Sequence, residues 1–209
     1  IMKTKILTHY INSTLQNGNK PKSIYHFCKE LEIEETDFYA HYSSLKHIEA
    51  SFWEAITEQT VSVIKESEEE VQKSVSHDLL TFYFTLFENL TLNRSYVLQS
   101  LEGHGSKLLI NKEIRKGVFP HLKLISEGIE TMAHKLSDDI GTKLSEEAVW
   151  FQFISILKYW MNDDSPSFES TDAFIEKSVR ASMELNQHIP TESILDYGKF
   201  VFKEFKKFL

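Results

Sequence analysis

The sequence predicts an all-α protein, and three observations lead to this prediction. The chain has 209 residues but only 7 Gly and 4 Pro, which favours helices joined by short connections. Apolar residues recur with a helical period along most of the chain. No segment shows the alternation of apolar and polar residues that is typical of a half-buried strand.

The first predicted helix spans roughly residues 3–17. Ile6, Tyr10 and Ile11 would face inward, and Gly18 follows at the position where a helix commonly ends. We therefore expect this helix to pack its apolar side on the segments that come next.

Two short amphipathic segments follow across one tight turn. In the first segment, one helical stripe is apolar and is preceded by Ser23 at the expected N-cap. The stripe consists of Ile24, Phe27, Cys28 and Leu31.

In the second segment, Ile33, Phe38 and Tyr42 would face the same core. The outward positions are Thr36, Asp37, Tyr39, Ala40 and His41. Two helices joined by such a turn form a helix-turn-helix, whose second helix can lie in the DNA major groove.

These residues resemble the TetR family of bacterial transcriptional repressors without a gap from Ile6 to Ile48. The segment FYAHYSSLKHI resembles the family's aromatic pair, His, aromatic, small-residue turn and start of a long helix. Gly18 and Ser23 also stand where the family has its Gly and its Ser or Thr cap. The resemblance implies a DNA-binding head at 1–49 and an effector-binding and dimerisation body at 50–209.

The DNA contacts that this resemblance implies are polar residues of the head. They are Lys22, Ser23, Thr36, Asp37, Tyr39, His41 and Lys46.

The sequence departs from the family pattern in three places. Glu32 replaces the usual Gly of the turn, and Leu45 replaces a common Lys, with Lys46 displaced by one. The start of the second helix is usually small and basic, whereas here it contains three acids, Glu34, Glu35 and Asp37. Carboxylates oppose phosphate binding, although they can also accept hydrogen bonds from cytosine amino groups or cap a helix N-terminus.

The charge distribution orients the molecule. Residues 1–49 carry six Lys and six acids, so the formal net charge of −8 belongs entirely to the remainder. A neutral head toward DNA and an acidic body away from it agree with this gradient. The absence of a long apolar run excludes a membrane-spanning helix, and the single Cys28, a packed thiol, suits a reducing cytoplasm.

A long helix is expected to begin at Leu45, after Ser43 or Ser44 as its cap, and to continue into the body. It would bury Ile48, Phe52 and Ile56 first, and then Val61, Val63 and Ile64. Further helices are predicted at 76–93, 94–110 (loosened near 103–105), 120–136, 144–161, 170–187 and 191–209. Residues 111–118 are predicted to be a polar connection, with Pro120 in the first turn of the next helix, and 137–141 a turn.

The family resemblance implies a homodimer, in which the helices near 144–161 and 170–187 pair with their copies as a four-helix bundle. Alternatively, these two helices close the core of one chain. The C-terminal helix is predicted to be amphipathic, with one apolar face and Lys residues between: the face consists of Ile194, Tyr197, Val201, Phe205 and Phe208, and the lysines are Lys199, Lys203, Lys206 and Lys207. We expect it to pack on its own chain or across the dimer, with no membrane as partner, although such a helix can also lie on a membrane surface.

A ligand pocket in the body would be apolar and edged by a few polar groups, as small-molecule sites usually are. Its predicted lining is Phe82, Tyr83, Phe87, Leu101, His104, His121, Leu122, Ile125, Phe153 and Tyr159. The same residues could instead form a filled core.

No catalytic triad, metal motif or phosphate loop is present, so we expect neither an enzyme nor a cofactor. The sequence therefore predicts a TetR-like repressor that an apolar small molecule releases from a palindromic, double-stranded DNA operator. The alternative is a helical dimer that binds a ligand or partner and has lost sequence-specific DNA binding.

Overall fold

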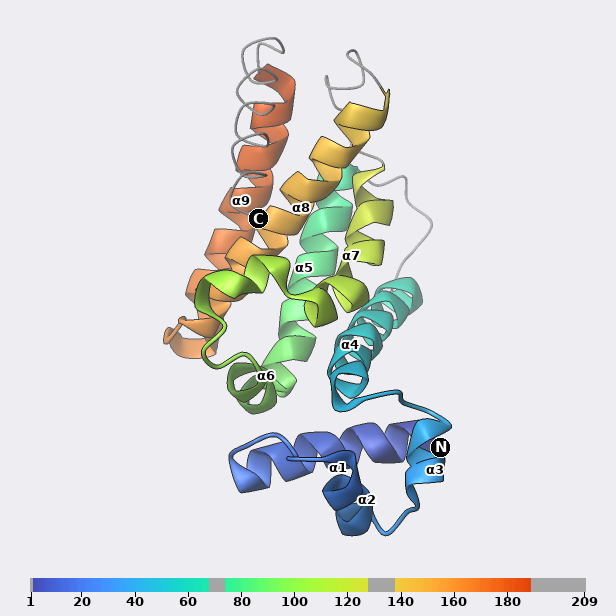
Figure 1. Ribbon diagram of the computed structural model, residues 1–209. Coiled ribbons are helices and arrows are strands. Elements are labelled where there is room, and N and C mark those ends of the chain that lie inside the picture. Colours follow the sequence, from blue (N-terminus) through green and yellow to red (C-terminus); the bar gives the residue numbers. More distant parts are fainter. Residues whose placement is uncertain (1, 68–73, 128–137, 189–209) are drawn as a thin grey trace.

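The computed structural model describes residues 2–67, 74–127 and 138–188. Every regular element in these ranges is a helix, which confirms the predicted all-α class. Figure 1 shows a small head, built from α1 to α3, beneath a taller helical body. Helix α4 runs from the head into the body.

The head consists of α1 (Met2–Asn17), α2 (Ile24–Leu31) and α3 (Glu35–Tyr39). Ile6, Tyr10, Phe27 and Phe38 are fully buried between them. The ring of Phe27 lies edge-on to Tyr10 and Phe38, with centroid distances of 6.0 and 5.9 Å. The predicted apolar stripes therefore meet in one aromatic core.

Helix α4 (Leu45–Ser67) begins after Ser44, whose Oγ accepts a hydrogen bond from the His47 amide at 3.2 Å. Ser44 is thus the cap, rather than Ser43. Ile48 and Ile56 are buried as predicted, whereas Val63 is 43% exposed. The inward course predicted for Val63 is wrong, because that side of α4 faces solvent.

The described part of the body contains seven further elements. They are α5 (Val75–Leu92), α6 (Arg94–Ser100), the 3₁₀ helix η1 (Gly105–Ile110), α7 (Lys112–Ser126), α8 (Asp138–Met161) and α9 (Glu169–His188), the last preceded by the short η3 (Pro166–Phe168). Helix α5 lies among the others in Figure 1. Its buried residues form one broad face of the helix, namely Leu79, Phe82, Tyr83, Leu86, Phe87, Asn89 and Leu90.

Residues 111–118 do not form the predicted polar connection. The Asn111 side chain accepts from the Ile114 amide at 2.9 Å and caps α7, which begins at Lys112. Pro120 lies inside this helix and not in its first turn. The charged residues and Gly117 suggested a connection. However, Ile114 and Val118 lie four residues apart on one side of the helix, and both are fully buried.

The turn predicted at 137–141 is also wrong, because α8 already begins at Asp138. The Asp-Asp pair suggested a turn, but acids are equally favoured at the start of a helix. Residues 128–136 of the helix predicted at 120–136, and the whole C-terminal helix predicted from 191, lie outside the described residues.

Candidate nucleic-acid interface and effector groove

The turn between α2 and α3 is closed by a residue in the left-handed region. Glu32 has φ 56° and ψ 47°, which confirms that this chain closes the turn without glycine. The Ile33 amide donates to the Cys28 carbonyl at 3.0 Å, and the Ser23 hydroxyl accepts from the His26 amide at the other end of α2. Both ends of α2 are therefore fixed, and α3 leaves it at a defined angle.

Helix α3 uses one of its acids as a cap. An Oδ of Asp37 accepts from the Glu34 amide at 3.3 Å. This supports the capping interpretation for Asp37 and occupies part of its carboxylate. Thr36 and His41 are exposed, and Tyr39 is 54% exposed beside the buried Phe38.

The acids of α3 also act electrostatically on the head. Burial raises the pKa of Cys28, and the carboxylates of Glu35, Glu34 and Asp37 raise it further. The thiol therefore stays protonated and packed. The same negative field faces the surface on which DNA would lie.

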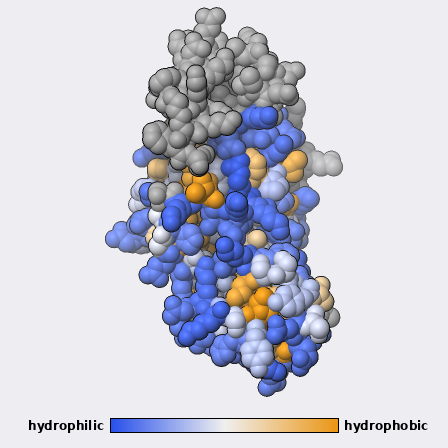
Figure 2. Space-filling model, in the orientation of Figure 1, coloured by the Kyte–Doolittle hydropathy of each residue, from blue (hydrophilic) through white to orange (hydrophobic). Residues whose placement is uncertain are grey.

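All seven residues predicted to contact DNA are exposed in the head, and they lie on or beside α2, α3 and the start of α4. Lys22 and Ser23 precede α2, Thr36, Asp37 and Tyr39 lie on α3 with His41 just after it, and Lys46 is in the first turn of α4. Figure 2 shows that the described surface is largely hydrophilic in this view, with a compact apolar patch on the head.

The ten residues predicted to line a ligand pocket do not surround one cavity. Six of them are buried in continuous core packing, namely Phe82, Tyr83, Phe87, Leu101, Leu122 and Phe153. The ring of Phe87 lies 6.2 Å from that of Phe153 and 6.0 Å from Trp160. The Tyr83 hydroxyl donates to Gln152 Oε1 at 3.2 Å instead of edging a free space.

Three further predicted residues lie apart from that core. His104 precedes η1, and its ring Nδ1 is 3.2 Å from the Glu102 carbonyl. Tyr159 is 39% exposed and stacks on Phe174 of α9 at 4.4 Å. His121 is partly buried on α7, and this burial lowers its pKa.

A groove of about 390 Å³ lies among α4, α5 and α7. Its lining is Val61, Ile64, Lys65, Val75, Asp78, Thr81, Phe82, Leu124 and Ile125. Only Phe82 and Ile125 belong to the predicted set. The wall is mainly apolar with three polar groups, which is the usual composition of a small-molecule site.

A second hollow, about 600 Å³, follows α1 on the surface of the head. Five of its six lining residues, Thr4, Lys5, Thr8, His9 and Asn12, are polar side chains of α1. It is a surface hollow lined by α1 and Leu31 alone, and no three helices enclose it as they do the groove among α4, α5 and α7. We therefore regard the groove among α4, α5 and α7 as the better candidate despite its smaller volume.

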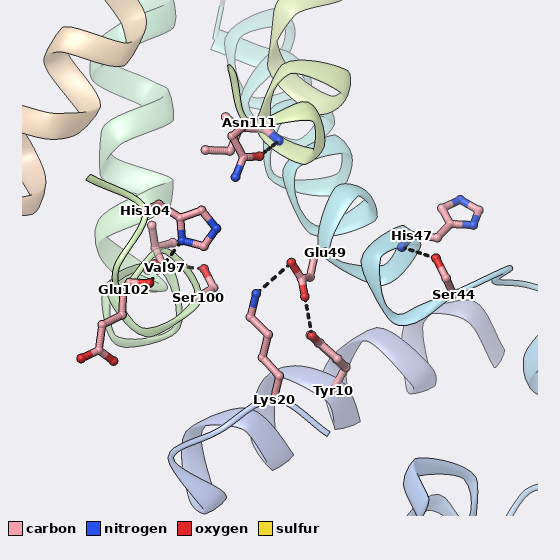
Figure 3. A network of polar contacts seen from close by, with 11 residues as sticks. Tyr10, Lys20, Ser44, His47, Glu49, Val97, Ser100, Glu102, His104 and Asn111 are labelled. Carbon is pink, nitrogen blue, oxygen red and sulfur yellow. Dashed lines mark hydrogen bonds and ion pairs between the residues drawn. The ribbon is translucent and has the colours of Figure 1, made fainter. Parts of the chain in front are cut away.

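The joint between head and body carries a polar network that the sequence did not reveal. Figure 3 shows Glu49 of α4 between Tyr10 and Lys20. The Tyr10 hydroxyl donates to Glu49 at 2.8 Å, and Lys20 Nζ lies 3.0 Å from its other carboxylate oxygen. Burial, followed by the charge of Glu49, raises the pKa of Tyr10 far above its ordinary value, so the hydroxyl remains a donor.

A second contact joins α1 to the body. Gln99 of α6 donates to the Thr14 carbonyl of α1 at 2.9 Å. Phe52 of α4 and Tyr96 of α6 pack edge to face nearby, with ring centroids 4.8 Å apart. Helix α1 is therefore held by both α4 and α6.

Neither a metal site nor a membrane-spanning helix is found in the part of the chain that the structure describes. Within these ranges, no group of His, Cys, Asp and Glu side chains could hold a metal ion. No helix there has the length and apolar character needed to cross a membrane.

A helix-turn-helix head carried by a continuous helix on an all-helical body defines a class of regulatory proteins. The comparison with protein families agrees with this class, because residues 78–201 match the model described as tetracyclin repressor-like, C-terminal domain. The matched range is more than half of the chain, and the chain therefore belongs to the TetR family of regulators. A comparison with curated proteins gives no match.

Proposed function

We propose that this protein is a homodimeric transcriptional repressor whose two heads bind a palindromic operator. The observation that carries the proposal is the helix-turn-helix itself, with a capped α2, a closed turn and an exposed polar face on α3. Family membership of the body supports the same function independently. Two heads are needed because one head contacts too few base pairs to be specific.

The proposed dimer interface consists of α8 and α9. These helices lie side by side in Figure 1. Phe151 of α8 is 62% exposed although it is large and apolar, and Tyr159 stacks with Phe174 on the same pair of helices. Pairing with a second copy would remove this apolar surface from water.

The proposed effector is an apolar small molecule that binds in the groove among α4, α5 and α7. The groove is lined by Val61 and Ile64 of α4, the same helix that carries the head. A molecule that binds one position of α4 better than another would shift the population of head positions. Operator release follows if the favoured spacing of the heads no longer matches the half-sites.

A second candidate function rests on the acids of α3. Glu34 and Asp37 are exposed on the surface that would face the DNA phosphates, where cationic side chains would be favourable. Helix α3 itself contains no Lys or Arg. A dimer that binds a ligand or a partner protein and no longer reads DNA is the alternative. In the repressor, the exposed carboxylate of Glu34 could instead accept from cytosine amino groups.

One experiment separates the two functions. The purified protein selects fragments of genomic DNA, and the affinity for the best fragment is then measured against salt concentration. The repressor predicts a palindromic site and a log-log slope of about −4 or steeper, which corresponds to four or more phosphate contacts. Failure to enrich any site at low salt would favour the binding protein without DNA recognition.

The assignment of Tyr39 and His41 to phosphate contacts gives a further test. The double substitution Tyr39→Ala and His41→Ala should weaken binding to all DNA sequences alike, because phosphate contacts carry no sequence information. The matched control is Thr36→Ala, because Thr36 lies on the side of α3 that is proposed to face the DNA major groove. A loss confined to one base position in the double variant would contradict the assignment.

A further inference from the structure

We propose that Gly117 is a positioning residue for DNA binding. It allows α7 to lie directly against the backbone of α4 and so fixes the position in which α4 holds the head. This inference rests on the proposed repressor function and adds a residue that touches neither DNA nor the effector groove.

The geometry at Gly117 leaves no room for a side chain. A Cβ at this position would lie 2.4 Å from the Cβ of Trp53, 2.5 Å from its carbonyl carbon and 2.6 Å from the amide nitrogen of Glu54. Two of these three atoms are backbone, so no change of a Trp53 rotamer could make space. Ordinary contact starts near 3.4 Å, and an alanine would therefore push the two helices about 1 Å apart.

The backbone conformation does not require glycine at this site. Gly18, Gly103 and Gly105 have positive φ and nothing within 4 Å of a built Cβ, so they are needed for their conformation. Gly117 is buried within α7 and is not among the residues with positive φ. Glycine inside a helix is destabilising relative to alanine. Its role here is therefore the close approach to α4.

The contact between Gly117 and Trp53 lies between two functional parts of α4. One part contacts the head, and the other lines the effector groove. Glu49, which holds α1, precedes Glu54 by about 8 Å along the helix, and Val61 of the groove follows it by about 10 Å. An ion pair between Lys116 and Glu54 at 2.9 Å holds the helices at the same level. Because α4 is continuous, a displacement at this contact moves the head relative to the body.

The test is Gly117→Ala, with Lys112→Ala as a control on the exposed surface of α7. Circular dichroism and sedimentation first establish that each variant is folded and dimeric. Both variants and the unsubstituted chain then select from a library of palindromes whose half-sites are separated in steps of one base pair. We expect Gly117→Ala to keep the half-site sequence, to bind the original spacing about tenfold more weakly, and to shift its preference to a neighbouring spacing.

The possible outcomes separate this inference from the proposed function. An equal loss at all spacings, or no change, would mean that Gly117 has only a structural role and would overturn the inference. If the unsubstituted chain enriches no site, the proposed function fails and the inference fails with it. If Gly117→Ala does not melt cooperatively, Glu54→Gln replaces it, because it removes the ion pair with Lys116 at the same contact. A broadened range of accepted spacings would then support the inference, and an unchanged range would overturn it.

Discussion

The carboxylate of Glu49 lies at the joint between head and body and accepts from two parts of the head at once. Tyr10 reaches it from within α1, and Lys20 reaches it from the loop before α2. A buried hydroxyl that donates to a charged acceptor contributes more than an ordinary hydrogen bond. The link is therefore expected to stabilise the head as well as to orient it.

Replacing Tyr10 by Phe tests this link. The variant removes only the hydroxyl and should lower the free energy of unfolding by about 1–3 kcal/mol, because Glu49 loses a hydrogen bond in a partly buried site. Urea unfolding measures the change. Tyr25→Phe is the matched control, since Tyr25 is 61% exposed and should change stability by less than about 0.5 kcal/mol. Equal effects of the two variants would contradict the role of the link.

Asp163 shows how hydrogen bonds can outweigh burial. Burial alone would raise its pKa, but hydrogen bonds from Thr171 and Ser165 lower the pKa from 3.8 to about 2. The Thr171 hydroxyl and amide donate to Oδ2 at 2.6 and 2.9 Å, and the Ser165 amide and hydroxyl donate to Oδ1. The carboxylate thereby caps the start of α9.

A depressed pKa in the folded state stabilises the protein above the unfolded-state pKa and ceases to do so as the pH falls through the folded-state value. The stabilisation by Asp163 should thus be complete above about pH 4 and disappear as the pH falls toward 2. The stability difference between the unsubstituted protein and Asp163→Asn, followed by unfolding at several pH values, should shrink over this window. Asp164→Asn, at an exposed neighbour, is the control for removal of one carboxylate.

At the scale of elements, the turn between α2 and α3 carries a local strain that packing maintains. Glu32 occupies the left-handed region, where a side chain is disfavoured and glycine is not. The apolar stripe of α2 and the buried Phe38 of α3 hold the two helices at this angle. The turn therefore forms although Glu32 is poorly suited to a positive φ.

Substitutions of Glu32 measure this strain. Glu32→Gly should be more stable than Glu32→Ala by about 1 kcal/mol, because both remove the carboxylate but only glycine relieves the positive φ. Thermal unfolding of the two variants gives the comparison without a difference in charge. Equal stability would mean that the turn relaxes to another conformation.

Helix α7 and the start of α8 show why some elements were not predicted from the sequence. The segment before Pro120 is charged, contains Gly117, and precedes a proline that favours a first turn, so local signals indicated a connection. Its local helical signals, the Asn111 cap and the i, i+4 spacing of Ile114 and Val118, were outweighed by these, and packing on α4 completes the helix. By contrast, the aromatic stripes of α5 and α8 were predictable, because large apolar residues at helical spacing must be buried.

At the scale of the whole molecule, the head was predictable from sequence and the groove was not. The residues expected to contact DNA follow from a motif with fixed spacing, and the described head presents all of them on its surface. The same aromatic residues can fill a core or line a cavity, and only packing decides between these outcomes. Here Phe87 and Phe153 fill the core, while Phe82 lies at the edge of the groove.

The proposed dimer gives a prediction for the assembly. Phe151→Arg should place a charge in the interface of α8 and α9 and dissociate the dimer, because an unpaired charge is costly to bury. Sedimentation velocity measures the mass. Ile110→Arg is the control, since Ile110 is 64% exposed on η1, away from the proposed interface. Dissociation by the control and not by Phe151→Arg would move the interface elsewhere.

The contacts across the joint also determine how freely heads could be exchanged between related regulators. A graft cut after residue 49 would retain Glu49 with Tyr10 but would separate Tyr42 from Ser51, whose hydroxyl donates to it at 3.2 Å. It would also leave Thr14 dependent on a glutamine at position 99 of the recipient. A transplantable head would therefore extend through Ser51 and need a compatible α6, because a cut after residue 49 separates it from these two contacts.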